Sequence, residues 1–153
     1  MSSTLEVEVR AAVAAVDDPE YPGVSIVDLG LLESLGVSGG RVEVGLIPTF
    51  SGCPALAMIA DEVRETVGAV DGVAEVEVTW LPGPVWSVER VSARARERLA
   101  SDFTVAVAVH LGPPPACPLC GGRTSELSAF GPSRCRSVHR CTSCGEVVEA
   151  LRG

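Results

Sequence analysis

The six cysteines of this sequence are its clearest candidates for metal binding or reactive chemistry. Four of them form two C-x-x-C pairs, Cys117 with Cys120 and Cys141 with Cys144, and twenty residues separate the pairs. Within each pair the chain turns back in four residues, so both sulfurs can face one point, and two such pairs supply the four thiolates of a tetrahedral zinc site. The spacing therefore predicts a closed, structural zinc site in preference to disulfides or idle buried thiols.

Two further side chains in the same segment could join this chemistry. His139 stands two residues before Cys141 and could replace one thiolate, although four cysteines already complete a zinc site. Cys135 could be a buried structural thiol, an alternative ligand or a reactive group, and we expect the structural role.

The remaining cysteine, Cys53, stands alone in the segment 49–54. Proline is favoured at the first position of a helix, so Pro54 places Cys53 at or next to a helix N-cap. Free backbone N–H groups and the helix dipole stabilise a thiolate there, which could bind a soft metal ion or act as a nucleophile. A small buried hydrophobe is the equal alternative. The only histidines, His110 and His139, do not stand at the spacing of a cysteine protease, so a thiol enzyme is a weak hypothesis.

The composition favours a cytoplasmic metal-binding protein over one that binds nucleic acid or spans a membrane. Residues 1–116 hold seven arginines and seventeen acidic residues, a net charge of −10, whereas residues 117–153 have a net charge of +2. The acidic part would repel phosphates. The N-terminus lacks the basic and apolar regions of a signal peptide, and no apolar run reaches the length of a membrane span. We therefore expect a cytoplasmic protein whose thiols stay reduced.

The elements that must position these side chains follow from apolar periodicity and turn residues. We expect helices at 4–16, 54–70 and 92–100, and strands at 31–37, 41–47, 73–81 and 103–110. The fold class is α+β. A small α-β-β-α-β-α domain at 1–102 precedes a linker at 103–115, which contains the last predicted strand and a proline-rich stretch, and a zinc-ribbon module follows at 116–153.

Two short segments resemble the signatures of the small iron–sulfur-cluster assembly domain family. Residues 18–30, DPEYPGVSIVDLG, resemble its opening signature. Residues 48–54, PTFSGCP, resemble the second signature, in which Cys53 matches the reactive cysteine of the family. The continuation into the cysteine module, with Cys135 and the Phe130-Gly131 step, resembles the two-part layout of the PaaD family of phenylacetate-degradation proteins over nearly the whole chain.

This resemblance implies an accessory role rather than an enzymatic one. The chain would help metal-centre or iron–sulfur maturation of the multicomponent phenylacetyl-CoA epoxidase, or would alternatively be a structural docking subunit of that complex. Cys53 would hold transient iron or a nascent cluster, with Thr49 beside it. Asp18, Glu20 and Asp28 would shape an acidic pocket, although Asp18 and Asp28 could equally do no more than hydrogen-bond turns. The partners would be epoxidase subunits or iron–sulfur assembly proteins, and a homodimer is left open.

The arginines of the cysteine module form a separate expectation. Arg134, Arg136 and Arg140 stand between the two cysteine pairs, in the part of the chain with a positive net charge. We expect these side chains to face an acidic surface of a partner protein.

Overall fold

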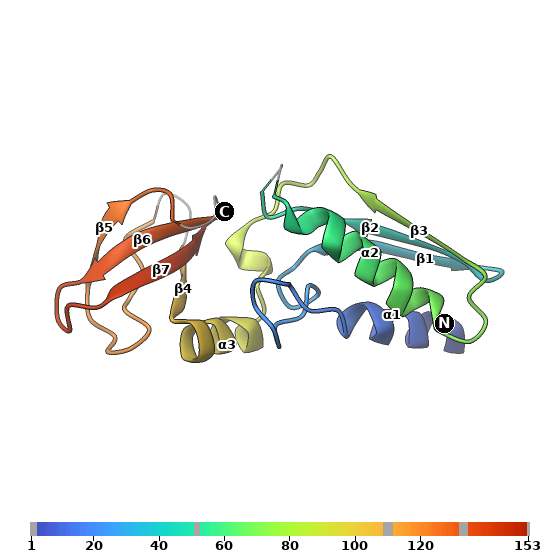
Figure 1. Ribbon diagram of the computed structural model, residues 1–153, viewed down its shortest axis with the longest axis horizontal. Helices are drawn as coiled ribbons and strands as arrows, with labels where there is room; N and C mark the ends of the chain where they lie inside the picture. The colour runs from blue at the N-terminus through green and yellow to red at the C-terminus, as the bar shows by residue number, and fades with distance from the viewer. Residues whose placement is uncertain (1–2, 51–52, 109–111, 132–134, 153) are drawn as a thin grey trace. The chain divides into compact units, whose positions relative to one another are not determined.

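The computed structural model describes residues 3–50, 53–108, 112–131 and 135–152. Contacts divide the chain into two compact units, Met1–Val85 and Trp86–Gly153. In the described residues, no helix combines the length and the apolar character needed to cross a bilayer. The elements are, in order, α1 (Thr4–Ala14), β1 (Leu32–Ser38), β2 (Arg41–Leu46), α2 (Ala55–Gly68), β3 (Glu75–Trp80), the 3-10 helix η1 (Val88–Arg90), α3 (Ala93–Phe103), β4 (Val105–Ala108), β5 (Thr124–Ser128), β6 (Arg136–Cys141) and β7 (Val147–Arg152) (Figure 1).

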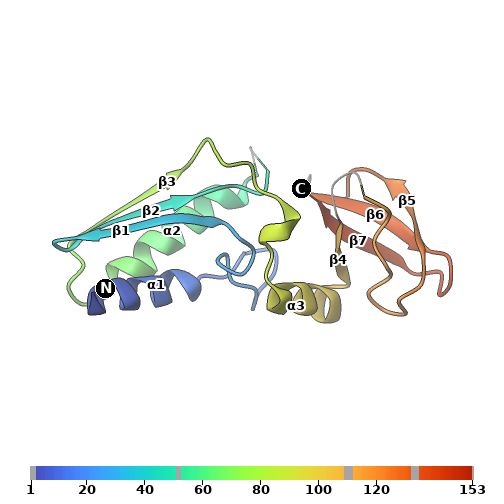
Figure 2. The same cartoon turned by 180° about the vertical axis from the view of Figure 1, so that it is seen from behind.

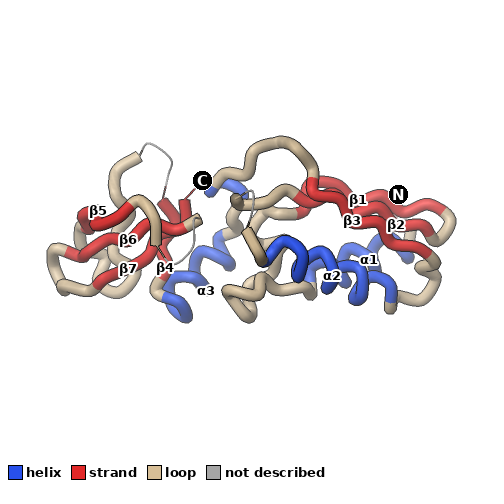
Figure 3. The backbone as a smooth tube through the Cα atoms, turned by 45° about the horizontal axis from the view of Figure 1, so that its top comes forward, coloured by secondary structure: helices blue, strands red, loops and turns tan. Residues whose placement is uncertain are grey.

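In the first unit, two helices lie on one side of a three-stranded sheet of order β1-β2-β3 (Figures 2 and 3). Strands β1 and β2 are antiparallel and β3 is parallel to β2. Apolar side chains recur at helical spacing on α1 and α2 and at every second position of β2, so each element presents one apolar stripe to the others. The buried residues of these stripes are Val9, Val13, Val42, Val44, Leu46, Ile59, Val63 and Val67.

Local sequence signals explain where the helices of this unit begin. The Oγ atom of Ser3 accepts a hydrogen bond from the N–H of Glu6 at 3.2 Å, so α1 has a capped first turn. Helix α2 has Pro54 as its N-cap residue, with no side-chain cap. The start of α2 predicted from Pro54 is therefore confirmed to within one residue.

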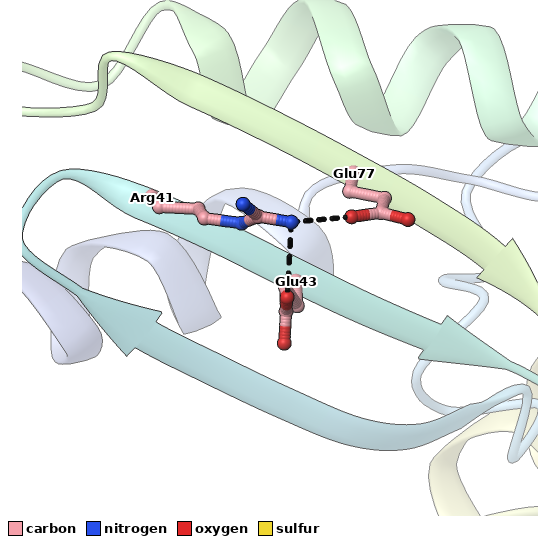
Figure 4. Close-up of polar contacts among 3 residues, drawn as sticks. All are labelled: Arg41, Glu43 and Glu77. Atoms are coloured by element: carbon pink, nitrogen blue, oxygen red, sulfur yellow. Dashed lines mark hydrogen bonds and ion pairs between the residues drawn. The ribbon is translucent and has the colours of Figure 1, made fainter.

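The side of the sheet away from the helices is polar. Arg41 lies between Glu43 and Glu77, at 3.4 Å and 2.9 Å from their carboxylate oxygens (Figure 4). Hydrogen bonding to Glu77 and the nearby charges of Glu75 and Glu43 raise the pKa of Arg41. These pairs are about half exposed, so their role is to separate carboxylates on neighbouring strands rather than to add much stability.

The second unit contains α3 and a four-stranded sheet of order β4-β7-β6-β5. Strand β4 is parallel to β7, whereas β5, β6 and β7 form an antiparallel meander. Arg96 ties η1 to α3, because its guanidinium donates to the carbonyl of Val88 at 2.6 Å and to that of Val91 at 3.2 Å. Buried Trp86, Val88 and Leu99 contribute to the core of this part.

The predicted order of helices and strands is confirmed from α1 to β4. The pairing of β4 is the new finding. This strand was expected in a linker, and it instead joins the sheet of the cysteine module, with α3 in contact with it. The predicted domain bounds, 1–102 and 116–153 around a linker at 103–115, stay a prediction.

We expect a Gly40→Ala substitution to destabilise the first unit. Gly40 has a φ of +85°, and a Cβ there would lie 2.9 Å from the carbonyl oxygen of Gly72. That contact is with backbone, which cannot rotate away, and the left-handed conformation adds its own cost for alanine. The unfolding free energy should fall by about 2–3 kcal/mol, measured by urea denaturation.

Gly39 provides the matched control in the same turn. Its φ is +57°, but nothing lies within 4 Å of the position that a Cβ would take there. Gly39→Ala should therefore lower the unfolding free energy only by the cost of the left-handed backbone conformation, about 1 kcal/mol. Equal losses in the two variants would contradict the proposed close approach at Gly40.

Candidate metal centre

The two C-x-x-C pairs lie in two turns that share one hydrogen-bonding pattern. The N–H of Cys117 donates to the carbonyl of Gly122 at 2.9 Å, and the N–H of Gly121 donates back to the carbonyl of Cys117 at 2.8 Å. The turn that begins at Cys141 repeats both bonds, at 2.8 Å and 3.1 Å. Gly121 and Gly145 occupy equivalent positions with φ of +74° and +80°, a conformation that glycine adopts without strain.

Strand pairing brings the two turns together. The first turn leads into β5 and the second leaves β6, and Thr124 of β5 lies opposite Cys141 of β6. Just beyond that pair, the N–H and the hydroxyl of Thr142 both donate to the carbonyl of Arg123, at 2.8 Å and 3.0 Å. The β5–β6 pairing therefore sets the separation of the two cysteine pairs.

The four sulfurs converge on one point. They all lie within 4.8 Å of one another, with Cys117 and Cys144 at 3.8 Å and Cys120 and Cys141 at 3.4 Å. A zinc ion with zinc–sulfur bonds of about 2.3 Å requires tetrahedral sulfur–sulfur edges of about 3.8 Å. The donor set and its spacing therefore fit zinc, and four thiolates leave no open position for a substrate.

Backbone N–H groups favour the thiolate form of one of these sulfurs, which is the form that binds a cation. The N–H of Cys144 lowers the pKa of Cys141 to about 6, with help from the N–H of Ser143 and against the effect of burial. The N–H of Glu146 favours a thiolate at Cys144. Hydrogen bonding to Cys141, burial and hydrogen bonding to Cys120 and Cys117 together outweigh that effect and raise the pKa of Cys144 to about 12. Without a cation Cys144 therefore keeps its proton beside the Cys141 thiolate, and metal binding would release that proton.

Cys135 and His139 lie outside this cluster. Among the described residues, the group of converging metal-ligating atoms contains the four paired cysteines and neither of these two. His139 is buried, and its Nε2 atom lies 2.7 Å from the hydroxyl of Ser137. Burial lowers the pKa of His139, so its imidazole is neutral. Cys135 is also buried, as its expected structural role requires.

Cys53 lies immediately before Pro54, the N-cap residue of α2, and is half-buried. Its carbonyl accepts a hydrogen bond from the N–H of Leu56 at 3.2 Å. The predicted position next to the helix N-cap is therefore confirmed. Within the described part of the chain, which omits residues 51 and 52, Cys53 belongs to no group of three metal-ligating side chains.

Several acids of the 17–30 loop hold turns in place. Oδ1 of Asp18 accepts from the N–H of Glu20 at 2.8 Å, and Oδ2 of Asp17 accepts from the N–H of Gly23 at 2.9 Å. The turn-forming alternative for Asp18 is thus realised. Asp28 is partly exposed in the same loop, and Thr49 is half-buried in the loop before Cys53. A pocket that unites these residues with Cys53 remains a prediction.

The three arginines expected to face a partner have different surroundings. Arg136 pairs with Glu149 of the neighbouring strand β7 and is largely buried, so its charge is balanced within the sheet. Arg140 is exposed at the end of β6. Arg134 lies outside the described residues, as does His110.

Sequence reasoning missed two residues that position the metal centre, Val148 and Thr124. Buried Val148 on β7 packs with Cys117 and Cys141. The hydroxyl of Thr124 donates to the carbonyl of Pro115 at 2.6 Å and so fixes the approach to the first turn. The alternation of Val148 and Ala150 was a signal for a third strand after the second cysteine pair.

Accessibility predicts which thiol reacts in the folded, zinc-loaded protein. Four cysteines would be bound to zinc and Cys135 is buried, whereas Cys53 is half-buried in a loop. We expect iodoacetamide at neutral pH to modify one cysteine per chain, and peptide mass spectrometry to place the adduct on Cys53. Adding a zinc chelator should raise the number of modified cysteines, which serves as the positive control. Modification of Cys135 before Cys53 would contradict this ordering.

Comparison with protein families assigns both parts of the chain. Residues 6–80 match the family model described as "Iron-sulfur cluster assembly protein", and residues 108–152 match the "PaaD zinc beta ribbon domain". The first match contains Cys53, and the second contains all four paired cysteines.

Individual proteins are similar to the whole chain or to its first part. A "Putative 1,2-phenylacetyl-CoA epoxidase" subunit of Escherichia coli is 33% identical over 151 residues, which cover 95% of this chain and 91% of that protein. The "Fe-S protein maturation auxiliary factor YitW" of Bacillus subtilis is 31% identical over 63% of this chain and 94% of its own. A crystal structure of a domain of unknown function from Bacillus anthracis is similar with a TM-score of 0.59 and 33% identity, and the match covers 63% of this chain and 92% of that domain.

Proposed function

The chain belongs to the PaaD family, in which an iron–sulfur cluster assembly domain precedes a zinc β-ribbon, and from this membership we propose that it is an accessory factor for a phenylacetyl-CoA epoxidase. Its role is to help mature a metal centre or iron–sulfur cluster of that oxygenase, and the iron is cargo rather than a resident cofactor. It catalyses no reaction of its own.

The position of Cys53 carries this proposal. The residue lies in the part of the chain that matches the assembly family, directly before α2, with its side chain partly exposed. A cysteine sulfur at this position can bind a soft metal ion. One thiolate cannot enclose a cluster as four can, so bound iron would be labile or shared between two chains. That property suits delivery better than storage.

The ribbon has a different part in this proposal. Zinc held by Cys117, Cys120, Cys141 and Cys144 is closed and structural, and it stabilises a module with few aromatic residues. The ribbon would hold the client protein while cargo passes through the other unit.

Two observations favour a second candidate, a docking subunit without metal transfer. Asp18 and Asp17 accept backbone hydrogen bonds within their own loop, and Cys53 has no described group of ligands around it. Under this alternative both units are binding surfaces, and Cys53 serves packing alone.

Co-production with the epoxidase subunits tests the accessory role. The subunits would be produced with and without this chain, and their iron content and epoxidation of phenylacetyl-CoA measured after removal of the chain. We expect both quantities to fall when the chain is omitted. Equal iron content and activity in the two preparations would reject the proposed function.

A further inference from the structure

We infer that the outer face of the ribbon sheet is a docking surface for an acidic, partly apolar surface of another protein. Its residues are Leu127, Phe130, Arg140 and Val147, here called the ribbon patch. The inference deepens the proposed function, because it assigns the contact with the client protein to one face of the second unit.

Strand register places Arg140 and Val147 of the ribbon patch side by side. Arg140 of β6 lies directly opposite Ser125 of β5 on one side and Val147 of β7 on the other. Residues opposite one another in an antiparallel sheet share a face. Leu127 lies at the irregularity of β5, where the register shifts between Glu126 and Ser128. The patch therefore spans three neighbouring strands, which Figure 1 shows side by side.

Phe130 is held next to this face by its own loop. The hydroxyl of Ser128 accepts from the N–H of Phe130 at 3.2 Å and donates to its carbonyl at 2.8 Å. The N–H of Gly131 donates to the carbonyl of Arg136 at 2.7 Å, and a Cβ on Gly131 would lie 3.1 Å from Val138. These bonds hold the backbone of Phe130 and Gly131 against β6.

The ribbon patch exposes apolar side chains to a degree that calls for a partner. Phe130 is 61% exposed, Leu127 is 53% exposed and Val147 is 47% exposed. A cluster of exposed apolar side chains with a polar rim is typical of a protein–protein interface. The opposite face of the sheet is internal, since His139, Val148 and Ala150 are buried there.

Arg140 determines the charge of the partner. It is exposed and has no ion-pair partner among the described residues, whereas Arg136 on the same strand pairs with Glu149. Arginine beside apolar side chains is characteristic of residues that dominate binding energy. The surface that fits the patch therefore offers a carboxylate to Arg140 and apolar side chains to Val147 and Leu127.

The test measures binding of the full-length chain to purified epoxidase subunits by biolayer interferometry. Arg140→Glu should raise the dissociation constant about tenfold or more, and Val147→Ser about threefold or more. Val7 and Arg10 provide matched controls on α1, since Val7 is 58% exposed and the Arg10 side chain 57%. Val7→Ser and Arg10→Glu should change the constant less than twofold. Wild-type binding should weaken as salt rises from about 50 to about 300 mM, because the contact is partly electrostatic.

The outcomes separate this inference from the proposed function. Unchanged affinity in folded, zinc-loaded Arg140→Glu and Val147→Ser would overturn the docking surface, even if omission of the chain still lowers epoxidase iron. Loss of affinity in these variants would support the surface, even if epoxidase iron proves independent of the chain. Self-association that Arg140→Glu abolishes, or binding of a short DNA duplex by the wild type, would assign the patch to another occupant and overturn it.

Discussion

A Cys120→Ser variant is expected to lose its zinc and the ordered fold of its C-terminal sheet. Cys120 is exposed, so serine at this position disturbs no packing, and the loss can be attributed to the missing thiolate. Structural zinc sites contribute about 10–16 kcal/mol of apparent binding free energy, which in such modules is folding free energy. Few buried aromatic side chains are available here to replace that contribution.

Three measurements check this result. Elemental analysis should find about one zinc per wild-type chain and far less in the variant. Thermal unfolding followed by near-ultraviolet circular dichroism should lose the contribution of the second unit. Hydrogen exchange should accelerate in β5, β6 and β7, whereas the protected amides of β2 in the first unit should keep their rates.

Cys135→Ser is the matched control for the zinc site. This cysteine lies in the same module but outside the group of converging sulfurs, and it is buried. The control should therefore keep its zinc, with at most a modest fall in melting temperature from the added polar group. Full zinc content in Cys120→Ser, or zinc loss in Cys135→Ser, would refute the assignment of ligands.

The local elements and the cysteine cluster were predictable because each depends on short-range rules. The hairpin at residues 38–40 needs glycine at two positive φ angles, and both Gly39 and Gly40 adopt them. The C-x-x-C pairs impose a turn of fixed size, so their convergence follows once β5 and β6 pair. In both cases a few residues determine the geometry and distant parts of the chain have little influence.

The remaining features depend on contacts that no local pattern encodes. Strand β4 is an apolar run that could pair with any strand edge, and its partner β7 lies some forty residues further along the chain. The role of Asp18 was open because the same carboxylate can bind a metal or accept a backbone N–H, and only the folded loop shows the hydrogen bond to Glu20. The sequence suggested that Arg136 would face a partner protein. In the structure it pairs with Glu149 of β7, which the sequence pattern does not place beside it.

Cys53→Ala should reduce epoxidase maturation as strongly as omission of the whole chain. The substitution removes the one thiol that the assembly domain offers at the start of α2, and leaves the ribbon and its docking surface intact. Alanine suits a half-buried position beside a helix N-cap, so we expect the variant to stay folded, with unchanged zinc content and unchanged affinity for the epoxidase subunits. The expected defect is therefore confined to the iron content of the client.

The experiment compares epoxidase subunits produced with wild-type chain, with Cys53→Ala, with Cys135→Ala and with no chain. Cys135→Ala controls for the loss of a thiol outside the zinc cluster and should support maturation as the wild type does. Iron content and epoxidation of phenylacetyl-CoA are measured in each. If Cys53→Ala matches wild type while omission fails, Cys53 serves packing and the docking-subunit alternative is correct. If only Cys53→Ala and omission fail, a thiolate at the start of α2 is what the client requires. The chain then contributes to metal transfer through the first unit and to recognition through the second.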